Sequence, residues 1–118
     1  FASIENHSDI HFELKVDEKI DWEIVNSNIK MQIYRILQES IHNIQKHANA
    51  TEVFISMAKF ENDLKIEIKD NGIGFDIAEK KQGIGLKNIQ DRLEQIGGTL
   101  TINSTIGKGT IIHLIFPI

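Results

Sequence analysis

Two glycines, Gly83 and Gly85, stand immediately before a segment whose apolar spacing predicts a helix. Backbone N–H groups at the start of a helix can hold phosphate oxygens, and glycine has no Cβ to obstruct their approach. Neither the Walker pattern nor the dinucleotide-binding fingerprint is completed around them. The same spacing of two glycines occurs twice more, at Gly72 with Gly74 and at Gly107 with Gly109. A single pair of this kind is weak evidence for phosphate binding, and a nucleotide fold that uses these glycines would be neither of those two.

An acidic residue ends the strand predicted just before the first glycine pair. Leu64, Ile66 and Ile68 alternate with polar residues, and Asp70 continues their parity. Because alternate residues of a strand face the same side, the carboxylate is aimed along the buried face. The alternative is a turn-forming aspartate before Asn-Gly. The weakly periodic segment 78–82 that follows favours a mobile lid.

A third group of polar residues lies on one ridge of a long predicted helix. Glu39, Asn43 and Lys46 bring a carboxylate, an amide oxygen and an ammonium group within about one third of the helix circumference. Asn43 and His47 fall at the edge of the apolar stripe, where a polar group needs a partner. Taken alone, this ridge also fits an ordinary helix edge with an i, i+4 contact.

The composition predicts a single domain. The 118 residues suffice for one compact core, and 41% hydrophobic with 25% charged residues is ordinary for a globular protein. The absence of cysteine excludes disulfides and thiolate chemistry. A net charge of -4 argues against a general nucleic-acid binder, and no apolar run is long enough to cross a membrane. Because the chain begins at Phe1 without an initiator methionine, we interpret it as a piece of a longer protein.

The predicted elements alternate between strands and helices. Period-two alternation predicts a strand with one buried face at 10–16, followed by a long helix that begins near Ile29 and ends near Asn49. Strands at 53–57 and 64–68 form a hairpin, and a second helix from Leu86 ends at a Gly-Gly cap. A last hairpin joins 99–105 to 110–116. This order predicts an α+β fold, a two-layer sandwich with a mixed, mostly antiparallel sheet covered on one face by about three helices.

The order of four short motifs is more specific than any one of them. ESIHNIQKHA, DNGIGFD, GIGLKNI and GKGT resemble the conserved boxes of the GHKL, or Bergerat-fold, ATPases. The Lys-His-Ala ending of the first box and the closing strand resemble the sensor histidine kinases paired with helix-turn-helix response regulators. The resemblance runs from about Gln32 to Ile118 and implies a catalytic, ATP-binding domain over residues 1–118.

The resemblance also implies a role for each matched residue. Glu39 would be catalytic by orienting or polarising the attacking group, and Asn43 would bind the Mg²⁺ that bridges the phosphates. Asp70 would accept a hydrogen bond from the adenine amino group, with Thr110 beside it. The remaining ATP-binding residues are implied to be Lys46, His47, Gly72, Gly74, Gly83, Gly85 and Leu86.

The resemblance further implies a partner domain. The γ-phosphate of ATP would pass to a histidine on a separate dimerisation domain of the same protein, and from there to a response regulator. His7, His11 and His42 do not stand in the expected motif of a histidine followed by an acid on a separate helix. We therefore expect a monomeric, cytoplasmic domain that contacts neither nucleic acid nor membrane and does not phosphorylate itself alone.

Three alternatives remain open at the level of sequence. An anti-sigma-factor-type serine kinase shares the boxes, although the Lys-His-Ala sequence and the closing strands fit it less well. A nucleotide-sensing module would bind ATP without transferring phosphate, and it would have no need to keep Glu39 and Asn43. A purely structural domain would make the four ordered boxes a coincidence.

Overall fold

A computed structural model describes residues 10–45, 49–74 and 86–118 of the chain. Within them, five strands form one sheet in the order β1-β2-β3-β5-β4, and two helices complete the fold. The strands are β1 (His11–Val16), β2 (Glu52–Phe60), β3 (Asp63–Asp70), β4 (Thr99–Thr105) and β5 (Gly109–Pro117), and the helices are α2 (Ser27–Asn43) and α4 (Leu86–Glu94). The predicted α+β class and the order of elements are confirmed. The expectation of about three helices applied to the whole chain, and two lie in the described part.

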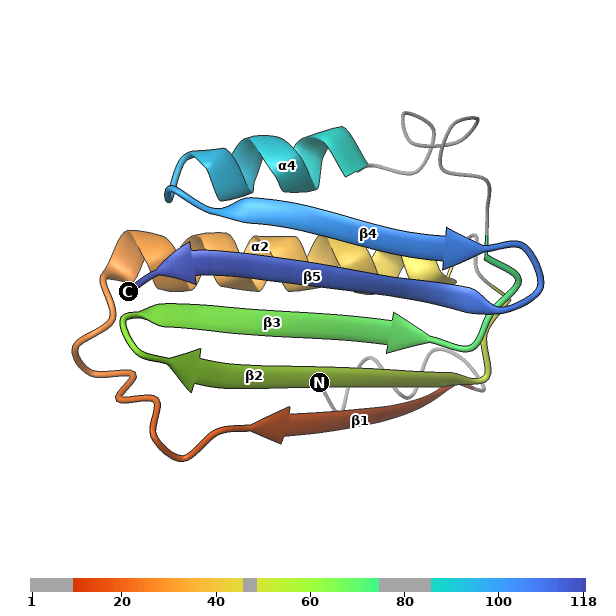
Figure 1. Cartoon of the computed structure of the whole chain (residues 1–118), viewed down its shortest axis with the longest axis horizontal. Helices are drawn as coiled ribbons and strands as arrows, with labels where there is room; N and C mark the ends of the chain where they lie inside the picture. Colours follow the sequence, from red (N-terminus) through yellow and green to blue (C-terminus); the bar gives the residue numbers. More distant parts are fainter. Residues whose placement is uncertain (1–9, 46–48, 75–85) are drawn as a thin grey trace.

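The sheet is mixed, as predicted. The β2–β3, β3–β5 and β4–β5 pairs are antiparallel, whereas β1 runs parallel to β2. A parallel pair needs a crossover connection, and α2 supplies it between β1 and β2. Figure 1 shows α2 behind the sheet and α4 along the β4 edge, so neither described helix covers the opposite face of the sheet.

The core lies between α2, α4 and the inner face of the sheet. Alternate residues of β2, β3 and β5 enter it, including Ile55, Ile66 and Leu114, each at most 1% exposed. α2 contributes Ile36 and Ile41 from its apolar stripe. The strand alternation and the helical spacing in the sequence therefore predicted the inner face correctly. No helix in the described ranges is both long and apolar enough to span a bilayer.

The termini of the helices follow from local chemistry. Asn26 caps α2, since its Oδ1 accepts a hydrogen bond from the Asn28 N–H at 2.7 Å. The predicted Gly-Gly cap of α4 is confirmed as a Schellman motif. In it, Gly97 has φ +75°, and the Gly98 N–H donates to the Leu93 carbonyl at 2.9 Å.

One expectation about the elements was only partly right, and another reaches outside the described residues. The α-helical part of α2 ends at Asn43 and continues as a π-helical turn at residues 44 and 45, so the predicted helix end near Asn49 depends on residues 46–48, which lie outside the described ranges. The alternating strand β1 buries its apolar face only in part, because Phe12 packs against the core whereas Leu14 and Val16 are 45% and 38% exposed. β1 is an edge strand, and Figure 1 shows α2 behind β5 and β4, so the helix does not cover it.

Candidate functional site

Asp70 is the last residue of β3, and its side chain lies on the buried face. The residue is 6% exposed, and it continues the inner row formed by Leu64, Ile66 and Ile68. Its Oδ1 accepts a hydrogen bond from the Gly72 N–H at 2.8 Å. The predicted burial of this acid is therefore confirmed. The contact with Gly72 also makes Asp70 a turn residue, so both interpretations of the sequence describe part of its role.

The electrostatics of Asp70 are those of a buried acid with no cation beside it among the residues that the structure describes. Removal from water raises the pKa of its carboxyl group, and hydrogen bonds from the backbone of Gly72 and Thr110 partly oppose that rise. A carboxylate in such a place can still accept hydrogen bonds, and it strongly favours a ligand that donates one. The carboxyl group of Asp70 is thus suited to a ligand group that donates a hydrogen bond.

Thr110 lies beside Asp70 although 40 residues separate them in sequence. The two Cα atoms are register partners across β3 and β5, and Thr110 is also 6% exposed. Its Oγ1 shares a hydrogen bond of 2.8 Å with the Ser104 hydroxyl, which also donates to the Gly109 carbonyl at 3.3 Å. This small network of hydroxyl groups fixes Thr110 next to the acid.

Gly74 occupies a place where a side chain does not fit. It has φ +65°, and a Cβ built on it would lie 2.1 Å from the Thr105 carbonyl oxygen. Gly72 is buried and carries the N–H that bonds Asp70. The backbone after Asp70 is therefore held tightly against the β4–β5 hairpin, and the Gly107 N–H adds a hydrogen bond of 2.6 Å to the Ile73 carbonyl. These contacts explain why glycines follow the acid.

The other candidate residues lie on α2. Glu39 and Asn43 are both half-buried on the last turns of this helix. Figure 1 shows that the C-terminal end of α2 lies toward the end of the sheet where β3 finishes and β5 starts. The fold thus brings the end of the helix with Asn43 to the same end of the molecule as Asp70 and Thr110. The π-helical turn at 44 and 45 follows directly, a feature common near functional sites.

Several predicted site residues lie outside the described part of the chain. These are Lys46, His47, Gly83 and Gly85. Leu86 is the first residue of α4, so its backbone stands at the start of that helix as expected. The phosphate-binding role of these residues stays a prediction.

The described side chains do not form a complete metal cage. Within the described ranges, no group of three or more His, Cys, Asp or Glu residues lies close enough together to hold a metal ion. Asn43 could offer one neutral oxygen. That donor set fits Mg²⁺, which usually keeps several waters and takes its other ligands from substrate phosphates.

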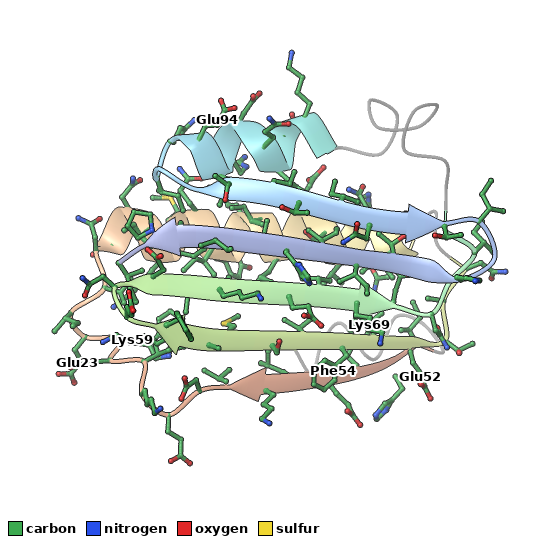
Figure 2. The ribbon with its side chains drawn as sticks, in the orientation of Figure 1. Glu23, Glu52, Phe54, Lys59, Lys69 and Glu94 are labelled. Carbon is green, nitrogen blue, oxygen red and sulfur yellow. The ribbon has the colours of Figure 1, made fainter. Side chains whose placement is uncertain are left out.

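A hollow of about 300 Å³ reaches Asp70 from the opposite side of the sheet. Figure 2 shows Phe54 and Lys69 in front of the sheet, on the face opposite α2. Both residues alternate with inner-facing neighbours, so the hollow does not contain the buried carboxyl group of Asp70. Its lining residues are His11, Glu13, Glu52, Val53, Phe54, Lys69, Asp70, Asn71 and Lys108. The charges around it are mixed and select no class of ligand.

Two residues of the site were not predicted as such. Gly109 has φ +92°, and a Cβ there would lie 2.2 Å from the Asp70 carbonyl oxygen. Its place directly before Thr110 in GKGT was the available signal. Asn71 makes three side-chain hydrogen bonds to residues 51 and 52. No local pattern marks it, since its partners are about 20 positions away in the sequence.

Together these features define a class of protein. A mixed sheet holds a buried aspartate at the end of a central strand, two glycines follow it, and a helix with polar residues ends nearby. This is the arrangement of an ATP-binding domain of the type that the sequence resembles. A family model described as histidine kinase-, DNA gyrase B-, and HSP90-like ATPase matches residues 28–118. The chain belongs to this family.

Relatives and solved structures narrow the position within the family. Sensor protein VraS of Staphylococcus epidermidis is 38% identical over 114 residues, which cover 92% of this chain and 33% of that protein. Oxygen sensor histidine kinase NreB of Staphylococcus carnosus is 36% identical over 95 residues, covering 79% of this chain and 27% of that protein. The chain thus spans about a third or less of the length of these relatives.

The fold is also found in solved structures. The histidine kinase domain of a blue-light activated kinase from Erythrobacter litoralis EL346 superposes with a TM-score of 0.77 at 20% identity, over 98% of this chain and 56% of that chain. Histidine kinase AdeS of Acinetobacter baumannii has a TM-score of 0.77 at 18% identity, over 99% and 58%. With the family match and the curated relatives, the chain is a catalytic domain of the kind found in sensor histidine kinases.

Proposed function

We propose that this domain binds ATP with Mg²⁺ and donates the γ-phosphate to a histidine on a dimerisation domain of the same protein. The observation that carries the proposal is the buried carboxyl group of Asp70 beside Thr110, at the end of the sheet toward which α2 ends. A buried acid that lacks a cationic partner among the described residues needs a hydrogen-bond donor, and the adenine amino group is one. Thr110 would complete the adenine end.

The residues of α2 would act on the phosphate end. Asn43 would hold Mg²⁺ through its side-chain oxygen, and the metal would supply charge neutralisation on the phosphates. Glu39 would orient or polarise the incoming imidazole. Lys46, His47, Gly83, Gly85 and the Leu86 amide would bind the phosphates or ribose. Phosphoryl transfer requires mainly positioning and electrostatic stabilisation, so these residues are sufficient for it.

The partners follow from the same proposal. In the transfer, the bond between the γ-phosphorus and the bridging oxygen of ADP breaks, and a bond to an imidazole nitrogen forms. We propose that the acceptor histidine lies on the dimerisation and phosphoacceptor domain, and that a response regulator receives the phosphoryl group next. A cytoplasmic location fits a domain that uses ATP.

Calorimetric titration tests the proposal. The 118-residue chain should release or absorb heat when ATP is added with Mg²⁺, and should transfer ³²P to an added dimerisation domain. GTP serves as the control, because its exocyclic oxygen accepts where the adenine amino group donates. No binding at millimolar ATP would refute the nucleotide site, whereas binding without transfer would favour a sensing module.

A further inference from the structure

The side chain of Asn71 connects two parts of the chain that are distant in sequence. Its Oδ1 accepts hydrogen bonds from the Thr51 N–H at 3.0 Å and the Glu52 N–H at 2.9 Å. Its Nδ2 donates to the Thr51 Oγ1 at 3.0 Å. The Asn71 backbone N–H also donates to the Glu52 carbonyl at 3.2 Å. Asn71, which directly follows the buried Asp70, therefore clamps the segment that leads into β2.

This clamp is not the usual use of asparagine in a turn. An asparagine in a turn commonly bonds the backbone two residues further on. Here that bond is made by Asp70 with the Gly72 N–H, which leaves Asn71 free to reach across to Thr51 and Glu52. The β2–β3 register ends at Val53 and Asp70, so the side chain provides the acceptor that the partner strand no longer offers.

The clamped segment is held from its other side as well. The Thr51 carbonyl accepts a hydrogen bond from the His11 N–H at 2.8 Å, at the start of β1. Two residues earlier, Asn49 adopts φ 51°, which turns the chain sharply. Residues 49–52 are thus the fixed end of the connection from α2 to β2, and their position depends on β1 and on Asn71.

We propose that Asn71 is a positioning residue that sets the end of α2, which carries Asn43, relative to the adenine-binding acid Asp70. The inference rests on the proposed function, since it assigns those two ends of the site to one nucleotide. Asn71 touches no substrate in this scheme. It acts through Thr51 and Glu52, and loss of its side chain would let the two ends of the site move independently.

The test combines one binding assay with one assay that needs no nucleotide. Asn71→Ala should speed hydrogen exchange of the Thr51 and Glu52 amides at least about tenfold, and should raise the dissociation constant for ATP with Mg²⁺ about five- to tenfold. Binding of adenosine, which reaches only the Asp70 end, should change less than about twofold. A merely structural loosening of the turn would weaken ATP and adenosine equally.

Matched variants make the result specific. Asn62→Ala makes the same change in the turn at the opposite end of β3 and should leave exchange at residues 51 and 52 and ATP affinity at parental values. Thr51→Val removes only the Oγ1 acceptor, so it should weaken ATP about two- to threefold. Asn71→Asp keeps an acceptor oxygen and should restore protection of both amides.

The outcomes separate this inference from the proposed function. If the parent does not bind ATP, the proposed function falls and the inference falls with it. If the parent binds ATP but Asn71→Ala binds it as tightly, or exchange at Thr51 and Glu52 does not change, the positioning role alone is refuted. Should Asn71→Ala fail to fold, the graded loss from Thr51→Val decides the question.

Discussion

Replacing Asp70 by asparagine tests the center of the proposed site with a change of one atom. The carboxyl group is 6% exposed, accepts the Gly72 N–H at 2.8 Å, and would accept the adenine amino group. In Asp70→Asn an amide N–H₂ can face that donor. A buried, charge-assisted hydrogen bond is worth about 2 to 3 kcal/mol, so the dissociation constant for ATP should rise roughly 30- to 140-fold.

The folded state should survive this change. Burial raises the pKa of Asp70, so the folded protein holds the proton of this carboxyl group more tightly than the unfolded chain does. The contribution of Asp70 to stability is therefore fully present below its unfolded pKa near 3.8 and is lost as the pH rises through the higher, folded value. At pH 7 the neutral amide avoids that loss but disturbs the hydrogen bond from Thr110, so the free energy of unfolding should change by less than about 1 kcal/mol.

The assay is calorimetric titration with ATP and Mg²⁺, supported by urea unfolding at pH 4 and pH 7. Asp63→Asn, the same change at the other end of β3, is the control and should bind ATP like the parent. The stability of the parent relative to Asp70→Asn should fall between pH 4 and pH 7. Parental ATP affinity in Asp70→Asn would refute the reasoning and leave Asp70 as a turn residue only.

Three further predictions concern the two sides of the site. Asn43→Ala should weaken Mg²⁺-dependent ATP binding and phosphoryl transfer together, because the metal orders the phosphates in the ground and transition states alike; transfer lost at unchanged affinity would contradict this. Glu39→Ala should keep or tighten ATP binding and lower the transfer rate to an added dimerisation domain, since the carboxylate repels the phosphates before transfer; equal losses of binding in both variants would indicate that this ridge only supports the helix. Gly109→Ala should lower the free energy of unfolding, measured in urea, by about 2 kcal/mol or more, because the new Cβ would meet the Asp70 carbonyl. The control Gly107→Ala should lower it by about 1 kcal/mol, since a Cβ at residue 107 meets nothing within 4 Å. Equal losses of stability in the two variants would refute the packing argument.

Much of the fold was predictable because it depends on patterns among residues that are close together in the sequence. Alternation along 64–68 predicted β3 and the burial of Asp70, and the predicted hairpin of 99–105 with 110–116 gave β4 and β5. The Gly-Gly pair after α4 predicted its Schellman cap. Such features depend on the backbone geometry of a few neighbouring residues, so the sequence specifies them directly.

The class of protein was also predictable, from the order of its four boxes. The family match over residues 28–118 bears out that interpretation. The assigned roles of Glu39 and Asn43 stay predictions, because the structure describes their position on α2 and not a bound nucleotide. Sequence spacing places side chains on a ridge, but it does not measure what that ridge faces.

Tertiary structure alone decided which distant segments meet. Insertion of β5 between β3 and β4 places Thr110 against Asp70 and Gly109 against the Asp70 carbonyl. The Asn71 side chain accepts a hydrogen bond from the Thr51 N–H, 20 positions earlier in the sequence. The edge position of β1, which leaves Leu14 exposed despite a regular alternation, was likewise set by the tertiary structure. Periodicity reports which side of a strand is apolar, whereas pairing and coverage depend on contacts between segments that no local pattern encodes.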